Sequence, residues 1–421
     1  IRTHQGRFRA DIAREGAQAL LKTLYELPQT QRVEIAGSLR RAKETVKDVD
    51  FVVSSDAPQE ISDAFVAHPD VGEVIAQGDT KSAVRLINGM QADLRVVPDR
   101  EFPYILHHFT GSKEHNVALR ARAQERGLKI NEYGLYRGEE RIECVDEAAF
   151  FAAMDLAYIP PELREGHGEI QAAAEDALPT LVTAADIRGM LHVHSTYSDG
   201  ADSLETMAEA LRARGYEYLG IADHSQSAAY AGGLGTDAVK RQWDEIDQLN
   251  EKLAPFRIFK GIESDILGDG SLDYTDDILQ HFEYIVVSVH SQFNLDREKM
   301  TARIVRAIEH PAATIVGHLT GRLLLDREGY DVDVDQIIEA AARNRVAIEI
   351  NAHPARLDID WRHVKNARDK GVQIAINTDA HSTGGLDNIS YGIGIGRKGW
   401  LRAEDVPNVL DCEAIASWFQ S

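Results

Sequence analysis

The stretch MLHVHSTYSDG, residues 190–200, ends a run of apolar residues in two histidines and an aspartate. His192 and His194 are two positions apart, so in a β-strand their side chains leave the same side. Together with Asp199 they offer ligand atoms for one metal ion. A short buried strand that happens to end in polar residues has the same local pattern, so the rest of the chain has to separate the two interpretations.

From residue 189 onward, short β-rich runs alternate with amphipathic helical segments at 201–214, 237–252, 296–309, 333–344 and 361–370. The runs are GMLHVH, YEYLGIAD, FRIFKGIE, YIVVSVH, ATIVGH, VAIEIN and VQIAIN. This alternation predicts parallel strands with right-handed crossovers. About seven such units favour a closed α/β barrel over an open sheet.

Polar residues follow these runs regularly, and the carboxyl ends of parallel barrel strands meet on one face. Six of the 16 histidines stand at such ends, which makes isolated structural histidines a poor explanation. Three other polar residues at strand ends, Asp223, Glu349 and Asn351, are not counted among the candidate metal ligands. The nine candidate metal ligands are His192, His194, Asp199, His224, Glu263, His290, His318, Asp379 and His381.

Imidazole and carboxylate ligands without thiolate favour Zn²⁺, Mn²⁺ or Fe²⁺ over Ca²⁺. Nine ligands are too many for one tetrahedral ion and suit two or three ions. Neighbouring ions lower the pKa of a bound water and clamp phosphoryl oxygens, so phosphoester hydrolysis is the predicted reaction class. Arg322 and Arg356, beside these motifs, are either candidates for gripping substrate phosphate or ordinary surface arginines.

The motifs HVHSTYSDG, IADHS, GIESDI, SVHSQF, GHLTG and NTDAH resemble those of the polymerase and histidinol phosphatase (PHP) domain. The resemblance implies a distorted (β/α)7 barrel over residues 187–421 that holds two to three Mn²⁺ or Zn²⁺ ions. It also implies a metal-dependent phosphoesterase.

Upstream, VEIAGSLRRAKETVKDVDFVVSS (33–55) places a Gly-Ser turn after one strand and Asp48 and Asp50 on the next. These two carboxylates share one strand face and repel each other unless cations neutralise them. Asp93, on the later run MQADLRVV, completes a group of hard ligands that suits Mg²⁺. Most such aspartate pairs are solvated strand faces, but the turn and the third aspartate favour a metal site.

This region and FTGSKEHNVALRARAQERGLKINEYGLY (109–136) resemble the palm and thumb of family X DNA polymerases, within the nucleotidyltransferase superfamily. The resemblance implies that Asp48, Asp50 and Asp93 are catalytic and hold two Mg²⁺ or Mn²⁺ ions, and that Asp93 accepts the proton of the primer 3′-hydroxyl. The implied nucleotide-binding residues are Gly37, Ser38 and Arg41 at the triphosphate, His108, Phe109 and Gly111 at the sugar, Asn116 at the base, and Arg120 at the template strand.

Two positions depart from the family pattern. His108 stands where animal members have tyrosine, which puts discrimination between deoxy- and ribonucleotides in doubt. Lys47 stands where the family often has glycine, and it either points to solvent or perturbs metal binding.

Taken whole, the chain resembles bacterial PolX-type family X polymerases with a C-terminal PHP domain. We expect an α/β and α+β multidomain protein: 1–28, the helical end of a fingers region; 29–105, palm; 106–158, thumb; 159–186, linker; 187–421, PHP barrel. The family's N-terminal lyase-like and helix-hairpin-helix regions are missing, and the chain begins at Ile1, so a piece of a longer protein is expected.

The resemblance implies gap filling in base-excision repair, with dNTP and gapped or primer-template DNA as partners, and a 3′–5′ exonuclease or 3′-end phosphoesterase activity. Two alternatives stay open. One is a histidinol-phosphatase-like PHP phosphatase with a vestigial palm, and the other is a noncatalytic DNA-end scaffold.

Bulk composition limits the classes of protein further. The net charge of −22 argues against nonspecific coating of nucleic acid, and residues 151–421 carry −19 of it. No stretch approaches the length of a membrane span. Two cysteines, Cys144 and Cys412, fit a reducing cytosol, and we expect a cytoplasmic monomer.

Overall fold

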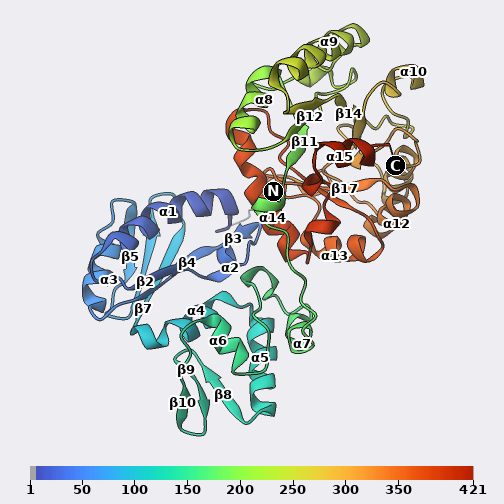
Figure 1. The fold of residues 1–421 in the computed structure, drawn as a ribbon. Coiled ribbons are helices and arrows are strands. Elements are labelled where there is room, and N and C mark those ends of the chain that lie inside the picture. The colour runs from blue at the N-terminus through green and yellow to red at the C-terminus, as the bar shows by residue number, and fades with distance from the viewer. Residues whose placement is uncertain (1–5, 421) are drawn as a thin grey trace. The chain divides into compact units, whose positions relative to one another are not determined.

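The computed structural model describes residues 6–420. It divides into two compact units, Ile1–Pro179 and Thr180–Ser421, which are described separately below (Figure 1). The predicted first and last segments include residues 1–5 and 421, which lie outside the described residues.

A five-stranded mixed sheet forms the centre of the first unit, in the order β2-β4-β7-β6-β5. Its strands are β2 (Arg32–Ile35), β4 (Asp48–Ser54), β5 (Val71–Ala76), β6 (Lys81–Leu86) and β7 (Gln91–Val97). The central pair, β4 and β7, is parallel, and the other pairs are antiparallel. A two-stranded pair, β1 (Phe8–Arg9) with β3 (Thr45–Val46), precedes β4.

Helix α1 (Ala10–Glu26) packs against α3 (Pro58–Val66) and against β4 (Figure 1). Its buried residues Ala13, Ala17, Leu20 and Leu24 recur at helical spacing and give it one apolar face. The short helix α2 (Gly37–Arg40) follows β2 directly and contacts β4. The turn between β2 and α2 therefore lies beside the strand that carries Asp48 and Asp50.

The remainder of the first unit combines helices with a small antiparallel sheet in the order β10-β9-β8. Its elements are η1 (Asp99–Glu101), α4 (Phe102–Thr110), α5 (Lys113–Glu125), β8 (Leu128–Asn131), β9 (Gly134–Arg137), β10 (Glu140–Ile142), α6 (Glu147–Ala152), η2 (Pro161–Leu163) and α7 (Glu169–Ala174). The segment predicted as a linker, 159–186, thus includes η2 and α7, and its Arg164 and Glu169 are fully buried. The limits of the five predicted segments stay a proposal.

Seven parallel strand positions close into a barrel in the second unit. They are β11 (Gly189–Val193), β12 (Tyr218–Ile221), β13 (Arg257–Phe259) continued by β14 (Gly261–Asp265), β15 (Tyr284–Ser288), β16 (Ile315–Val316), β17 (Ala347–Asn351) and β18 (Ile374–Asn377). All pairs in the two sheets are parallel. The bridges His224↔Glu263 and Val193↔Ala380 join the sheets, which confirms the predicted (β/α)7 fold.

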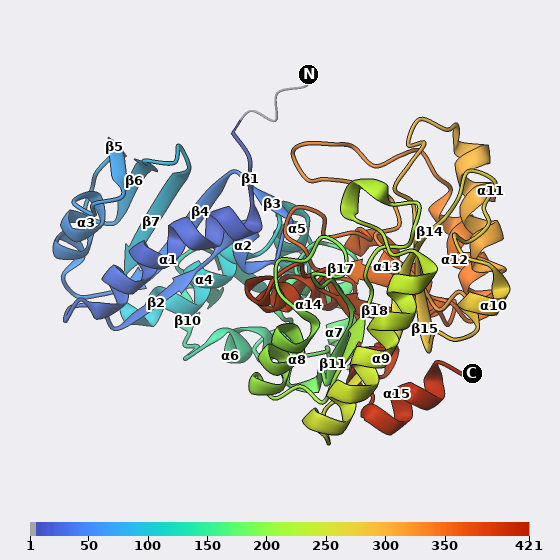
Figure 2. The ribbon, with the colours of Figure 1, turned by 90° about the horizontal axis from the view of Figure 1, so that it is seen from above.

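Each barrel strand is followed by a helix on the outside (Figure 2). The helices are α8 (Leu204–Ala213), α9 (Thr236–Leu253), α10 (Asp276–Leu279), α11 (Arg297–Ile308), α12 (Val334–Asn344), α13 (Trp361–Asp369) and α14 (Ile389–Lys398), with α15 (Cys412–Trp418) at the end of the chain. Shorter 3₁₀ turns are η3 (Ala184–Asp186), η4 (Ala229–Ala231), η5 (Thr383–Asn388), η6 (Ala403–Asp405) and η7 (Pro407–Val409).

Apolar side chains fill the amino end of the barrel, where Leu191, Tyr218, Phe259 and Tyr284 pack with Ile415 of α15. Successive strand residues point to opposite faces. On β17 the inward row that begins with apolar Ala347 therefore continues with polar residues toward the carboxyl end of the strand. The inward side chains are therefore apolar at the amino end of the barrel and polar at its carboxyl end, where the candidate site lies.

Within residues 6–420, none of the helices combines the length and the apolar character that a membrane crossing requires.

Candidate metal centres

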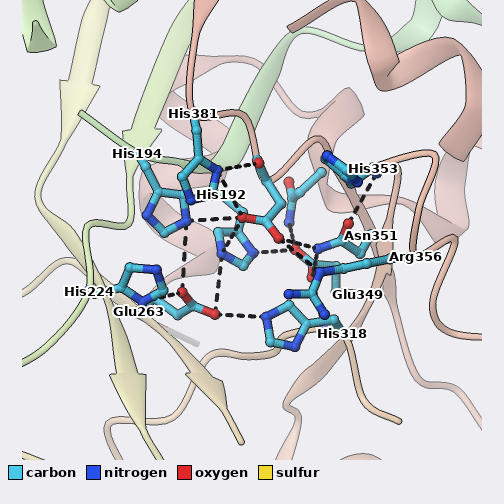
Figure 3. A network of polar contacts seen from close by, with 12 residues as sticks. His192, His194, His224, Glu263, His318, Glu349, Asn351, His353, Arg356 and His381 are labelled. Atoms are coloured by element: carbon cyan, nitrogen blue, oxygen red, sulfur yellow. Dashed lines mark hydrogen bonds and ion pairs between the residues drawn. The ribbon is translucent and has the colours of Figure 1, made fainter. Parts of the chain in front are cut away.

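The nine histidines and carboxylates predicted as metal ligands come together at the carboxyl ends of the barrel strands. Figure 3 labels six of them, which are His192, His194, His224, Glu263, His318 and His381. Most are buried, whereas Asp199 and His381 border solvent with about a third of each side chain exposed, 34% and 39%. The fold thus gathers residues that are up to 189 positions apart in the chain.

Glu263 stands at the centre of this cluster, on β14. Its Oε1 lies 3.0 Å from Nε2 of His318 and 3.3 Å from Nε2 of His290. Its Oε2 lies 3.0 Å from Nδ1 of His224. The two oxygens also lie 3.4 and 3.8 Å from Nε2 of His192 and of His194. One carboxylate therefore faces five imidazoles.

The other side of the cluster is built on Asp379 and Asp199. Asp379 Oδ1 lies 3.1 Å from Nε2 of His194 and 3.6 Å from Nε2 of His192. Asp199 reaches His381 Nε2 at 3.3 Å and His224 Nε2 at 3.6 Å. The loop that follows β11 thereby brings Asp199 back over the two histidines that precede it.

Buried polar atoms without a hydrogen bond test whether these residues fit cations. Seven such atoms belong to the cluster: His192 Nε2, His194 Nδ1 and Nε2, His224 Nδ1, Glu263 Oε1 and Oε2, and His318 Nδ1. A buried polar atom that forms no hydrogen bond costs free energy, and native proteins contain few of them. Unsatisfied imidazole nitrogens and carboxylate oxygens are the donor types that divalent cations take, and the tight ligand groups of the cluster bring several of them together, so the residues fit.

The pKa values of the histidines show that the carboxylates of the cluster create a negative environment. Burial alone lowers a histidine pKa, yet Glu263 and the Asp199 contact raise the pKa of His224 to about 10. Burial is likewise outweighed at His290, where Glu263 and Asp265 raise the pKa to about 9. At His194 burial dominates and lowers the pKa to about 3. The carboxylates thus attract positive charge into the cluster, and cations compete with protons for it.

In the residues that the structure describes, three groups hold all their ligand atoms within 4.8 Å of one another. They are His194, Asp199, His224 and His381; His192, His194 and Glu263; and His224, Glu263 and His290. His318 and Asp379 lie outside these tight groups but adjoin them through Glu263 and His194. Both have positive backbone φ angles, +22° and +51°, a strain that tends to occur at functional sites.

Two carboxylates outside the predicted ligand set hold the ligands in place. Glu349 Oε1 lies 2.7 Å from Nδ1 of His192, and its Oε2 accepts a hydrogen bond from the backbone N–H of His318 at 2.9 Å. Asp265 Oδ1 lies 2.6 Å from Nδ1 of His290. A partner on the far ring nitrogen fixes the orientation of a metal-binding imidazole. Asp265 follows Glu263 by two positions on β14, which is the sequence signal that could have found it.

Asp223, another polar strand end, has a structural task. It is fully buried and accepts hydrogen bonds from Ser195 and Ser198, 2.5 to 2.8 Å away, and from Gln242 at 2.6 Å. It therefore shapes the loop that carries Asp199 and makes no part of the cluster.

The two arginines proposed to grip phosphate occupy different environments. The side chain of Arg356 reaches the cluster, with Nε 3.5 Å from Asp379 Oδ2 (Figure 3). Arg322 pairs with Asp360 at 2.9 Å and donates to the backbone carbonyls of Arg356 and Leu357. Arg322 thus holds the loop that presents Arg356.

In the first unit, the sheet brings the three predicted aspartates together. Asp50 on β4 and Asp93 on β7 are direct partners in the parallel register, and Asp48 lies two residues before Asp50. Gln91 donates a hydrogen bond to Asp93 at 2.9 Å. The three carboxylates are not among the tight ligand groups found in the described residues.

The aspartates nevertheless perturb one another. Burial raises the pKa of Asp50 to about 7, with further contributions from Asp48 and Asp93. Burial and Asp93 also raise the pKa of Asp48. Like charges held close together favour a proton or a cation between them. The site therefore has the electrostatic character of a metal centre.

The turn at Gly37 approaches Asp50 closely. Gly37 has a φ of +65°, and a Cβ there would lie 2.0 Å from Asp50 Oδ2. Ser38 follows it on α2 and is partly exposed, and Lys47 is exposed beside the strand. The Arg41 guanidinium is held by Glu165 at 2.9 Å and by the backbone carbonyl of Thr110 at 2.7 Å.

The residues predicted to bind the sugar, base and template lie on α4 and α5. His108 Nε2 is 3.8 Å from Glu132, and the Phe109 ring lies under the Arg95 guanidinium at 4.9 Å. Asn116 donates hydrogen bonds to the backbone carbonyls of His108 and Gly111, 2.9 and 3.3 Å away. Arg120 is exposed. Their roles in nucleotide binding stay predictions.

Two family models match the chain. A model described as DNA polymerase beta thumb matches residues 105–165, and one described as PHP domain matches residues 190–353.

Comparison with curated proteins gives a match over nearly the whole chain. The chain is 41% identical over 418 residues to the DNA polymerase/3′-5′ exonuclease PolX of Bacillus subtilis (strain 168), covering 98% of this chain and 73% of that protein. It is 27% identical over 202 residues to a "Probable phosphatase" of Thermoanaerobacter sp. (strain X514), covering 45% and 77%. A "Probable phosphatase" of Citrobacter koseri is 29% identical over 203 residues, covering 46% and 78%.

Proposed function

The chain belongs to the PolX family of DNA polymerase/3′-5′ exonucleases, and from this premise we propose how its two units divide the work. The first unit adds nucleotides to a primer 3′ end, and the barrel removes nucleotides from 3′ ends. The observation that carries the proposal is the match to a PolX protein over 98% of the chain, which spans both units. Gap filling in base-excision repair is the task that this pair of activities serves.

In the first unit, Asp48, Asp50 and Asp93 hold two Mg²⁺ or Mn²⁺ ions, and Asp93 accepts the proton of the primer 3′-hydroxyl. The bound ions would neutralise the charge that develops on the triphosphate. Gly37 and Ser38 offer the turn that receives the triphosphate, and Arg41, whose guanidinium contacts Glu165 and the carbonyl of Thr110, contributes its charge. His108, Phe109 and Gly111 line the sugar site, with Asn116 at the base and Arg120 on the template.

In the barrel, the nine ligands hold two or three Mn²⁺ or Zn²⁺ ions, which would polarise the phosphodiester and activate water. Arg356 binds the phosphate oxygens, because it is the cation whose side chain reaches the cluster. Glu349 and Asp265 keep His192 and His290 oriented. Metal analysis of the purified protein tests this assignment, and fewer than two bound ions per barrel would contradict it.

A phosphatase without polymerase activity is the less supported alternative. The "Probable phosphatase" relatives match less than half of this chain, so that function leaves the first unit without a task. A noncatalytic scaffold likewise leaves the ligand cluster without one. Because the proposed substrate is DNA, we expect the enzyme to work with the chromosome in the cytoplasm. We also expect it to act as a monomer.

Primer extension on a gapped duplex with Mg²⁺ or Mn²⁺ tests the polymerase. Asp48→Ala should abolish extension, while His192→Ala should extend primers as the wild type does. Equal extension by the wild type and Asp48→Ala would sink the assignment of the first unit.

Release of a labelled 3′ nucleotide with Mn²⁺ tests the exonuclease. Here His192→Ala is the test variant and Asp48→Ala is the control. His192→Ala should lose release, and Asp48→Ala should keep it. Metal that is bound without any turnover by the wild type would favour the scaffold.

A further inference from the structure

Two large apolar side chains are exposed among the described residues of the second unit, and both belong to loops beside the ligand cluster. They are Tyr230, which is 71% exposed, and Phe293, which is 36% exposed. Tyr230 follows the ligand His224 by six positions, and Phe293 follows the ligand His290 by three. Other large apolar residues of this unit, such as Trp243 and Trp418, are partly buried, so Tyr230 stands out by the extent of its exposure.

The two rings differ in what covers them. Phe293 stacks on Tyr330 with ring centroids 6.0 Å apart, and the guanidinium of Arg327 lies 4.6 Å from its centroid. The ring of Tyr230 instead faces the cluster, with its centroid 6.1 Å from that of His224 and 6.3 Å from that of His290. Most of its surface is open to solvent. Tyr230 thus presents an aromatic face one side chain away from the ligands.

The loop that carries Tyr230 is tightly built. Leu234 N–H donates to the carbonyl of His224 at 2.9 Å, and Gly233 N–H donates to the carbonyl of Ala228 at 3.1 Å. A Cβ on Gly233 would lie 2.0 Å from the carbonyl oxygen of Ser225, so only glycine fits this close turn. The backbone that carries the ring is therefore held in position before any ligand arrives.

The same loop is connected to the ligands by hydrogen bonds. Ser227 donates to Asp265 Oδ2 at 2.8 Å, and Asp265 also contacts the ligand His290 at 2.6 Å. The loop starts at the ligand His224 itself. The backbone of the loop is thus anchored to the cluster at both His224 and Ser227.

We propose that Tyr230 is a stacking platform for the base of the 3′-terminal nucleotide, and so forms a nucleobase subsite next to the ligand cluster. When the phosphate of that nucleotide is held between the cluster and Arg356, its base projects by one sugar width, which is the scale of the 6 Å that separates Tyr230 from the histidines. Every base offers a π-face, so the subsite accepts any base. This inference rests on the proposed exonuclease function.

Steady-state release of the 3′ residue from a labelled single strand tests the subsite. The measurement compares a strand that ends in deoxyadenosine with one that ends in an abasic tetrahydrofuran residue. Tyr230→Ala should raise KM about tenfold or more on the normal strand, the range that loss of one base stack gives, and should leave KM unchanged on the abasic strand. Tyr230→Phe keeps the ring and should match the wild type on both.

The control variant is Tyr25→Ala, which removes a tyrosine that is 74% exposed on α1, and it should leave release unchanged. Equal losses on the two strands would overturn the inference, as would a Tyr230→Phe variant as slow as Tyr230→Ala, since that result assigns the effect to the hydroxyl. No effect of Tyr230→Ala would also overturn it. A wild type that releases no 3′ nucleotide would instead contradict the proposed function. Metal content and tryptophan fluorescence equal to those of the wild type verify that Tyr230→Ala is folded.

Discussion

Glu349 joins two proposed ligands of the barrel without belonging to the ligand set. Its carboxylate contacts Nδ1 of His192 and the backbone N–H of His318, and it accepts hydrogen bonds from the amides of Asn351 and Asn377 at 3.2 and 3.1 Å. Every neighbour on its two oxygens is a donor or a ring nitrogen. A neutral amide at this position would turn an N–H₂ group toward other donors.

We therefore expect Glu349→Gln to weaken metal binding by about 10- to 100-fold, the usual effect of losing such a supporting contact. Titration of the metal-free protein with Mn²⁺, followed by calorimetry, measures this. Glu339→Gln is the matched control, because Glu339 lies exposed on α12 in an ion pair with Lys370. Unchanged Mn²⁺ affinity in Glu349→Gln would show that His192 and His318 need no such support.

The sequence singled out the clustered histidines as candidate ligands more readily than it singled out the carboxylates that support them. Histidines at strand ends stand out because they are rare and chemically specific, whereas Asp265 and Glu349 resemble many other carboxylates. Their task depends on which side chain across the barrel they face, and a single sequence does not contain that distance. Asp223 is the opposite case, because it stands at a strand end as the candidate ligands do, yet its carboxylate accepts a hydrogen bond from Ser195 and takes no part in the cluster.

The turn between β2 and α2 places backbone against a proposed catalytic carboxylate. Gly37→Ala introduces a Cβ within 2.0 Å of Asp50 Oδ2 at a φ of +65°. We expect primer extension to fall by about 100-fold, because a misplacement of about 1 Å costs a reaction that much. Release of 3′ nucleotides by the barrel should not change.

Gly89→Ala separates backbone strain from the clash. Gly89 has a φ of +87°, but the nearest atom to its added Cβ is Phe8 Cζ at 4.0 Å. This variant should lose some stability and keep normal extension at a temperature where it is folded. Equal losses of activity in the two variants would assign the effect to strain alone.

Helices α4 and α5 bury two neutral histidines that make the first unit sensitive to acid. Burial lowers the pKa of His107 well below its usual value, helped by neighbouring His115 and Arg164. Burial also lowers the pKa of His115, although Glu169 opposes the shift. An unfolded chain binds protons at both positions below about pH 6.5, and the folded chain binds them only at a lower pH.

The stability that depends on these two groups is therefore complete above about pH 6.5. It falls between that pH and the pKa of each histidine in the folded chain, by at most about 1.4 kcal/mol per histidine for each pH unit. Hydrogen exchange of peptides from residues 102–125 between pH 7 and pH 5.5, corrected for intrinsic rates, measures the opening free energy. His107→Phe keeps a ring against Phe150 and should lose about half of the dependence. A pH-independent opening free energy would contradict this account.

At the level of elements, periodicity located the barrel helices well. The predicted segments 237–252 and 333–344 are α9 (Thr236–Leu253) and α12 (Val334–Asn344). Helix α14 escaped prediction because its sequence, ISYGIGIGRK, carries glycines that disfavour a helix. Tertiary packing requires one of them, since a Cβ on Gly392 would lie 2.6 Å from that of Ala352.

One predicted run divides in the structure. The run FRIFKGIE becomes β13 and β14, with a break at Lys260, whose backbone N–H donates to Glu283 Oε2 at 2.8 Å. A side-chain acceptor from outside the run causes the break, and no local pattern signals it.

On the scale of the whole molecule, the two sites lie on units with separate cores, and the spectroscopic probes are unevenly divided between them. All four tryptophans, Trp243, Trp361, Trp400 and Trp418, belong to the second unit. Their fluorescence therefore follows the barrel alone, whereas hydrogen exchange of peptides from residues 6–179 follows the first unit.

Removal of metal from the barrel should lower the stability of the second unit and not that of the first. The reason is that the seven unsatisfied buried atoms of the cluster belong to the barrel. Ligand at 100 times its Kd stabilises a folded protein by about 2.7 kcal/mol for each site. For a unit of this size about 1 kcal/mol shifts the unfolding midpoint by roughly 2–4 °C. In protein that carries metal in the barrel alone, with no free Mg²⁺ and no dNTP to load the first unit, excess EDTA should thus lower the midpoint of the tryptophan transition by about 5–10 °C for each ion lost and leave exchange in residues 6–179 nearly unchanged. Readdition of Mn²⁺ should restore the midpoint. His192→Ala should start from the lower midpoint and respond weakly to EDTA, and a full response in that variant would show that the stabilising ion binds elsewhere.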